Sequence, residues 1–197
     1  DLVFDAEGVC SACRNFQNRP EIDWEQREKR LIEVLDEHDG RVIVPSSGGK
    51  DSTYIALRLK SLGADVTAVT ATTCHLTPIG RANIDNLARH VRTIEVTPNM
   101  TVRAKLNRMA LELVGDISWS EHILIHRLPF QVARDIGVGL LMYGEAGPSQ
   151  YGGPQGTENI SEMTPRFVAE FGGFLGLRAE DFIGQEGITE RDMCDYM

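Results

Sequence analysis

The chain has 197 residues, of which 42% are apolar, and it carries a net charge of −9 from 29 acidic and 20 basic side chains. This length and apolar content predict one soluble globular domain with short appendages, and no apolar run approaches the ~20 residues that a membrane-spanning helix needs. The acidic balance argues against nucleic-acid binding as the main task.

The first part of the chain, residues 1–40, is predicted to be an N-terminal segment that contains one helix. Residues 1–22 show no helical or strand periodicity, so we expect them to be irregular. Asp23 is followed by Gln26 in the pattern of a capping box, and apolar residues then recur at helical spacing. A helix is therefore predicted over 24–38.

Residues 41–154 alternate between strand patterns and helix patterns. Strands are predicted at 41–45, 65–71, 92–96 and 138–143. Helices are predicted at 52–62, 80–91, 101–114 and 120–136. Strands that alternate with helices of this length predict an α/β fold, in which a parallel sheet is covered by helices on both faces.

The last part of the chain, residues 155–197, is predicted to be a C-terminal helical segment with two or three short helices. It follows a loop rich in glycine and proline that begins after Gly144. The side chains of Trp24, Trp119 and the phenylalanines of 167–182 are expected to belong to the core.

The most informative stretch joins the strand predicted at 41–45 to the helix predicted at 52–62. It consists of Ser46, Ser47, Gly48, Gly49, Lys50, Asp51 and Ser52. Two adjacent glycines let the backbone fold closely around an anion, and a helix that starts there directs N–H groups and a positive dipole toward that anion. The pattern predicts a phosphate-binding loop. It differs from the commoner phosphate loop, which has glycine where this chain has Val44 and a hydroxyl residue where it has Asp51.

Three side chains near this loop are candidates for catalysis: Lys50, Asp51 and Glu145. The carboxylates of Asp51 and Glu145 are suited to hold Mg²⁺ against a triphosphate. Alternatively, Asp51 complements the helix dipole and Glu145 is a solvated loop acid. Lys50 supplies an ammonium donor for phosphate oxygens.

Cys10 and Cys13 have the spacing of half a tetrahedral zinc site, and we expect a structural role for any zinc they bind. A reactive dithiol and two ordinary thiols remain alternatives. Cys74 is interpreted as a small buried residue, with sulfur transfer as the alternative. Together with Cys194, these cysteines lack the spacing of a secreted disulfide framework, so a reducing, cytoplasmic location is expected.

Two further positions carry side chains suited to ligand binding. Arg81, at the start of a predicted helix, is expected to neutralise triphosphate charge, with surface solvation as the alternative. His122 and His126 lie four residues apart and therefore on one helix face. Because no third metal ligand is evident nearby, packing or substrate hydrogen bonding is expected there, and His122 is taken as a substrate residue.

The run Ser-Gly-Gly-Lys-Asp-Ser at 47–52 resembles the motif of the PP-loop ATP pyrophosphatases. This resemblance implies an adenine nucleotide alpha hydrolase-like fold that binds ATP with Mg²⁺ and releases AMP and pyrophosphate. It implies that residues 46–52 bind the phosphates. It also places Ala71, Thr72, Arg81 and Gly144 among the nucleotide contacts.

Beyond this motif, the chain resembles the N-acetyl sugar amidotransferases of bacterial surface-polysaccharide and lipopolysaccharide biosynthesis. The stretches that carry the likeness are 4–14, 22–24, 44–54, 80–83, 143–145 and 151–154. The resemblance implies that the amide oxygen of an N-acetylated, nucleotide-linked sugar is adenylated and that ammonia from a separate glutaminase then forms an acetamidino group. It places Tyr151, Gly152 and Gly153 with His122 on the substrate side. Because family members are longer, we expect the C-terminal segment to be incomplete.

Two other functions remain open from the sequence. The same adenylation serves sulfur or ammonia transfer to tRNA or another base, and a nucleotide-binding sensor or scaffold needs no turnover. A homodimer is compatible with either kind of function.

Overall fold

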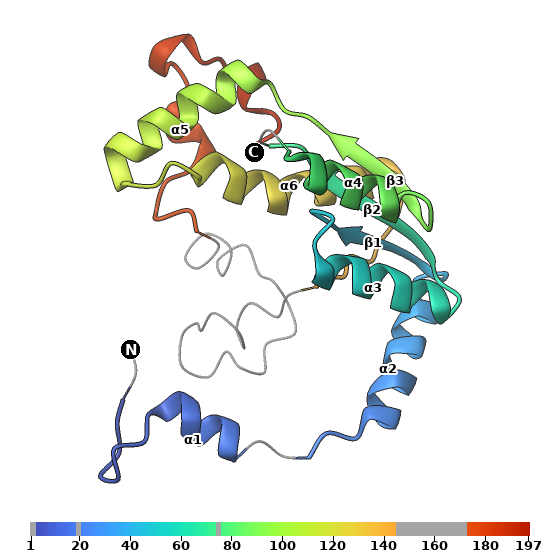
Figure 1. Cartoon of the computed structure of the whole chain (residues 1–197). Coiled ribbons are helices and arrows are strands. Elements are labelled where there is room, and N and C mark those ends of the chain that lie inside the picture. The colour runs from blue at the N-terminus through green and yellow to red at the C-terminus, as the bar shows by residue number, and fades with distance from the viewer. Residues whose placement is uncertain (1–2, 19–20, 74–75, 145–172) are drawn as a thin grey trace. The chain divides into compact units, whose positions relative to one another are not determined.

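The computed structural model describes residues 3–18, 21–73, 76–144 and 173–197 of the chain (Figure 1). These residues divide into two compact units, Asp1–Val34 and Leu35–Met197. Among the residues described, none of the helices has the length and apolarity required to span a bilayer.

The N-terminal unit begins with a hairpin that leads into helix α1 (Ser11–Gln17). An antiparallel bridge joins Phe4 to Cys10, and Asp5 accepts hydrogen bonds from the backbone N–H groups of Glu7 and Val9, each at 2.9 Å. Arg14 of α1 reaches back to the carboxylates of Asp5, at 2.6 Å, and Glu7. The expectation that residues 1–22 are irregular is therefore wrong, because contacts between the hairpin and α1 stabilise a helix that lacks apolar periodicity.

Helix α2 (Trp24–Glu37) follows the sequence-based prediction closely, and the boundary between the two units falls within it. The Asp23 carboxylate accepts the N–H of Gln26 at 2.9 Å, so the predicted cap is present. Trp24 is 72% exposed, which corrects its assignment to the core. It lies in the first turn of α2, whose buried residue is Leu35 near the other end.

The larger unit is built on a parallel sheet of β1 (Arg41–Pro45), β2 (Asp65–Ala71) and β3 (Arg92–Val96), in the order β1-β2-β3. The register pairs Val42 with Val66 and Ala68 with Thr93. Helix α3 (Lys50–Ser61) connects β1 to β2, and α4 (Pro78–Leu87) lies between β2 and β3 (Figure 1). The predicted α/β fold with a parallel sheet is confirmed.

The two faces of the sheet have different helical neighbours. Ile43 and Val69 share one face and pack with Ala133 near the end of α6 (Trp119–Asp135). Val42 and Val44 alternate with Ile43 and so point to the other face, where α3 contacts β1 and β2. Helices thus cover both faces, as an α/β fold requires.

The strand predicted at 138–143 forms only a single parallel bridge, between Ile43 and Leu141. The Ile43 N–H donates to Leu140 at 2.9 Å, and the Ile43 carbonyl accepts from Met142 at 2.9 Å. Pairing does not extend toward the start of β1, where the Arg41 side chain instead donates to the carbonyls of 136 and 137 after α6. We call residues 138–144 the edge segment. It lies on the side of β1 opposite to β2.

A second core joins α5 (Met100–Val114) and α6 to the C-terminal part of the chain. Trp119 is fully buried, its ring lies 4.6 Å from that of Phe182, and its indole N–H donates to the Phe174 carbonyl at 3.0 Å. The described part of the C-terminal segment contains three short 3-10 helices, η1 (Ala179–Phe182), η2 (Gln185–Gly187) and η3 (Arg191–Met193).

Candidate functional site

The loop between β1 and α3 is held in shape by its own serine hydroxyls. The Ser46 N–H donates to the Val69 carbonyl at 2.8 Å, so the loop begins as a continuation of the sheet. Ser46 is 7% exposed, and its Oγ accepts the Gly48 N–H at 3.1 Å and lies 2.9 Å from Ser52 Oγ. Ser46 therefore stabilises the conformation of the loop through these contacts. The side chain of the neighbouring Ser47 is exposed.

Of the two adjacent glycines, Gly48 has the stronger steric requirement. Its φ is +76°, and a Cβ there would lie 2.8 Å from Ile84 Cγ1 and 3.1 Å from the Ile84 nitrogen of α4. Gly49 has an ordinary φ of −72°, and among the described residues its Cβ would meet only Ser47 Oγ, at 3.3 Å. The loop is thus packed tightly against α4 at Gly48 and is more open at Gly49.

Helix α3 starts at Lys50, and the residue before it, Gly49, has no side chain with which to cap the first turn. Such a helix start presents N–H groups and the positive end of the dipole, which favours anions. The Lys50 ammonium lies 2.9 Å from both carboxylate oxygens of Asp51. These side chains are 88% and 56% exposed, so their mutual attraction is weak and phosphate oxygens or a cation can compete for them.

The edge segment ends directly against this helix start. A Cβ on Gly144 would lie 3.0 Å from the Asp51 carbonyl carbon and 3.0 Å from the Ser52 nitrogen. Because β1 lies between β2 and the edge segment, the chain order reverses at this point of the sheet. Open α/β sheets bind ligands outside the carboxyl ends of their strands at such a switch point. The predicted residues Glu145, Tyr151, Gly152 and Gly153 lie outside the described residues.

Ala71 and Thr72 lie at the same, carboxyl end of the sheet, on the strand next to β1. The Thr72 N–H donates to the Val96 carbonyl at 2.8 Å, which extends the sheet beyond β2. The following Thr73 carbonyl accepts a hydrogen bond from Arg103, which pairs with Glu121 at 3.1 Å. This end of β2 is therefore anchored to α5 and α6. Cys74, the candidate for sulfur chemistry, lies outside the described residues.

Arg81 of α4 binds two carboxylates of the protein. Its guanidinium donates to both oxygens of Glu95, at 2.7 and 2.8 Å, and to Asp85 at 2.9 Å. The hydrogen bonds to Glu95 and then Asp85 raise the pKa of Arg81 above its ordinary value. Contact of Arg81 with a triphosphate stays a prediction, and it would require an exchange of these ion pairs.

His122 and His126 of α6 lie on one helix face, as their spacing predicts. His122 Nδ1 lies 3.3 Å from an Asp116 oxygen. Burial, with a smaller effect of His122, lowers the pKa of His126. The His126 ring lies 6.0 Å from that of Tyr143, the residue before Gly144. Tyr143 is not among the candidate contacts that the sequence predicts, although it directly precedes the candidate Gly144.

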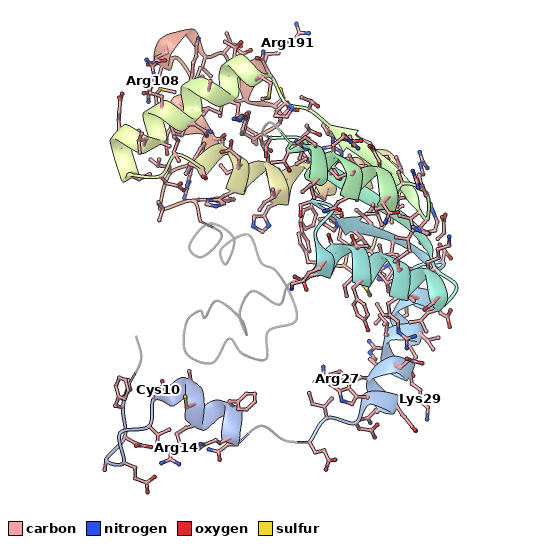
Figure 2. The ribbon with its side chains drawn as sticks, in the orientation of Figure 1. Cys10, Arg14, Arg27, Lys29, Arg108 and Arg191 are labelled. Atoms are coloured by element: carbon pink, nitrogen blue, oxygen red, sulfur yellow. The ribbon has the colours of Figure 1, made fainter. Side chains whose placement is uncertain are left out.

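The cysteine pair belongs to the N-terminal unit, where Cys10 directly precedes α1 and Arg14 lies within it (Figure 2). Hydrogen bonds from the Cys13 backbone and thiol lower the pKa of Cys10, and the same interaction raises the pKa of Cys13. In the described part of the chain, no group of three or more His, Cys, Asp or Glu side chains is arranged to hold a metal ion. Zinc binding stays a prediction.

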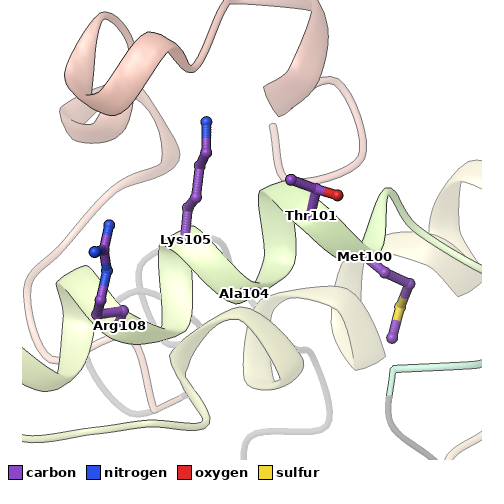
Figure 3. Close-up of a pocket in the computed structure, with 5 residues that line it drawn as sticks. All are labelled: Met100, Thr101, Ala104, Lys105 and Arg108. Carbon is purple, nitrogen blue, oxygen red and sulfur yellow. The ribbon is translucent and has the colours of Figure 1, made fainter.

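A hollow of about 540 Å³ on α5 is separate from all predicted site residues (Figure 3). Its lining residues are Met100, Thr101, Ala104, Lys105 and Arg108. Both cations contact the C-terminal segment, because Lys105 donates to the Glu186 carbonyl at 2.7 Å and Arg108 pairs with the Glu186 carboxylate. Lys105 and Arg108 therefore hold the C-terminal segment against α5.

The fold and this loop define an α/β protein with a glycine turn at the carboxyl end of its first strand. No family model matches the chain, and no curated protein matches it. Among solved structures, it is similar to NAD+ synthetase from Burkholderia pseudomallei, with 16% identity, a TM-score of 0.46 and coverage of 93% of this chain and 75% of that one. It is also similar to a predicted subunit of tRNA methyltransferase from Methanocaldococcus jannaschii DSM, with 21% identity, a TM-score of 0.41 and coverage of 64% and 67%. These likenesses are weak, and the proposed function does not rest on them.

Proposed function

We propose that this chain is an ATP-dependent amidotransferase that converts the acetamido group of a nucleotide-linked sugar to an acetamidino group. The observation that carries the proposal is the Gly48–Gly49 turn, which lies at the switch point of the sheet and precedes a helix start without a side-chain cap. Such a turn suits a polyphosphate anion. The likeness of residues 47–52 to the PP-loop motif directs the reaction to the α-phosphorus.

An amide carbon is a poor electrophile because its nitrogen donates electrons into the carbonyl. In the proposed reaction the amide oxygen attacks the α-phosphorus of ATP, the bond to the β-phosphate oxygen breaks, and pyrophosphate leaves. Ammonia then attacks the activated carbon, and AMP leaves with the former amide oxygen. The products are the amidine, AMP and pyrophosphate.

The residues of the loop bind and stabilise the departing pyrophosphate. Backbone N–H groups at the start of α3, the Ser47 and Ser52 hydroxyls and the Lys50 ammonium are donors for its oxygens. Asp51 fits a Mg²⁺ site, since its carboxylate is exposed beside the loop and this ion is commonly bound by one or two carboxylates plus phosphate oxygens. When bound, Mg²⁺ would neutralise charge on the leaving group.

The remaining assignments rest on the family resemblance. Glu145 is proposed as a second carboxylate, and His122, Tyr151, Gly152 and Gly153 as sugar-side contacts. Ammonia is proposed to come from a separate glutaminase. The cytoplasmic location and the homodimer likewise remain proposals.

The test is a product analysis with ATP, Mg²⁺, ammonium chloride and a panel of UDP-linked N-acetyl sugars. We expect AMP and pyrophosphate, together with a sugar in which oxygen has been replaced by NH. An acetamido group labelled with oxygen-18 should transfer the label to AMP. Release of ADP and phosphate, or thiolation of RNA in place of sugar turnover, would overturn the proposal.

Asp51→Asn should abolish most turnover while the denaturant midpoint changes little, because the exposed pair with Lys50 adds little stability. Asp65→Asn is the matched control, since Asp65 is exposed and begins β2 at the opposite end of the sheet. Equal loss of activity in the two variants would show that the effect is not specific to the loop.

A further inference from the structure

Two half-buried polar side chains from different elements lie near each other beside the loop. The rings of His126 on α6 and Tyr143 on the edge segment lie 6.0 Å apart. Leu141 packs on the α6 side of the sheet, and a residue two positions later points to the same side. Tyr143 directly precedes Gly144, which contacts the first turn of α3. The pair is therefore next to the proposed nucleotide site.

Both side chains bury a polar atom that lacks a partner among the described residues. These atoms are Tyr143 Oη and His126 Nδ1. A buried hydroxyl or imidazole nitrogen without a hydrogen bond destabilises the folded state, and such groups are uncommon in native proteins. Phenylalanine could fill the space of Tyr143 without that cost. A ligand that reaches these two atoms would satisfy both of them.

The chemistry of the pair is that of uncharged hydrogen bonding. Phe174 packs edge-on against His126 at 6.3 Å, and burial lowers the pKa of His126, which favours the neutral imidazole. A phenol O–H is a donor, and a neutral imidazole offers one nitrogen as an acceptor. A secondary amide has the complementary groups, a carbonyl oxygen that accepts and an N–H that donates.

We propose that Tyr143 and His126 bind the acetamido group of the acceptor, an inference that rests on the proposed function. The Tyr143 hydroxyl donates to the amide oxygen, and His126 Nδ1 accepts from the amide N–H. The second lone pair of the amide oxygen stays available for attack on the α-phosphorus. Neutral partners also disfavour acceptors that carry a carboxylate at this position, because a carboxylate has no N–H for the imidazole.

The decisive variant is Tyr143→Phe, which removes one oxygen and retains the ring. With UDP-N-acetylglucosamine as the probe, we expect its KM to rise about tenfold, as for the loss of one buried hydrogen bond, while the KM for ATP stays unchanged. Stability should be equal or higher, since an unsatisfied hydroxyl is removed. Tyr54→Phe is the control, because Tyr54 is exposed on α3. An unchanged acceptor KM in Tyr143→Phe, with AMP still released, would overturn this inference and leave the proposed function standing.

A second measurement does not need turnover. Chain labelled with nitrogen-15 at histidine is titrated with UDP-N-acetylglucosamine in the presence of AMP, and the His126 ring signals are followed. We expect a saturable shift that is weaker in Tyr143→Phe and that UDP-glucosamine, which lacks the acetyl group, does not produce. If the shift is absent, or if the spectra show His126 bonded to another residue of the chain, the inference fails. If the shift occurs but no acceptor releases AMP, binding stands and the proposed reaction fails.

Discussion

Gly48→Ala should destabilise the protein and weaken ATP binding together, because one contact controls the shape of the loop. The added Cβ would lie 2.8 Å from Ile84 Cγ1, 3.1 Å from the Ile84 backbone nitrogen and 3.3 Å from Asn83 Cβ. Ile84 is fully buried, and a backbone atom cannot rotate away as a side chain can. Either α4 or the loop must therefore move.

The loss of unfolding free energy in Gly48→Ala has two separate causes. A left-handed conformation at a residue with a Cβ costs about 1–2 kcal/mol. Overpacking against a closely packed neighbour adds about 1–3 kcal/mol. Gly115 provides the control, because its φ is also +76° but a Cβ there would meet no atom of the described residues within 4 Å. Gly115→Ala should show the first cost alone, so the difference between the variants should be about 1–3 kcal/mol.

Both variants are measured by urea unfolding, and ATP affinity is measured by calorimetry. Gly115→Ala should leave ATP affinity unchanged, since Gly115 ends α5 away from the loop. Gly48→Ala should lower it, because the displaced loop no longer presents its N–H groups to the phosphates. Equal unfolding free energies in the two variants would refute the steric argument. Unchanged affinity in Gly48→Ala would refute the role of this loop in binding ATP.

Two further predictions concern pH and zinc. Because the pKa of His126 is lower in the folded chain than its unfolded value of about 6.5, the folded state binds fewer protons. The contribution of His126 to stability is therefore fully present above about pH 6.5 and is lost as the pH falls toward the pKa of the folded state. In urea unfolding across this range, the unfolding free energy of His126→Leu should depend less on pH than that of the original chain. An identical pH dependence would contradict the lowered pKa of His126. Cys10 and Cys13 supply only two ligands, so elemental analysis of protein purified without chelator should find less than one zinc ion per chain. A stoichiometric zinc content that Cys10→Ser removes would instead show that other ligands complete the site.

Much of the sheet could be predicted because its signals are local. The three strands begin and end at the predicted residues, since runs rich in β-branched residues and bounded by glycine or polar residues are typical of strands. The extent of pairing in the strand predicted at 138–143 could not be predicted from local signals, since only one bridge to β1 forms. Whether its backbone pairs along β1 depends on where α6 and Arg41 place it, and that is a property of distant contacts.

The two glycines of the loop illustrate the same division. A glycine turn between the first strand and the next helix could be predicted from residues 46–52, because glycine pairs and helix patterns act over a few residues; in the structure the helix begins at Lys50. The contact of Gly48 with Ile84 and that of Gly144 with the start of α3 follow from the packing of the whole fold. The same holds for the pairing of Arg81 with Glu95 and for the position of Tyr143 beside His126. These contacts join residues from different elements, and their distances depend on how the whole sheet and its helices pack.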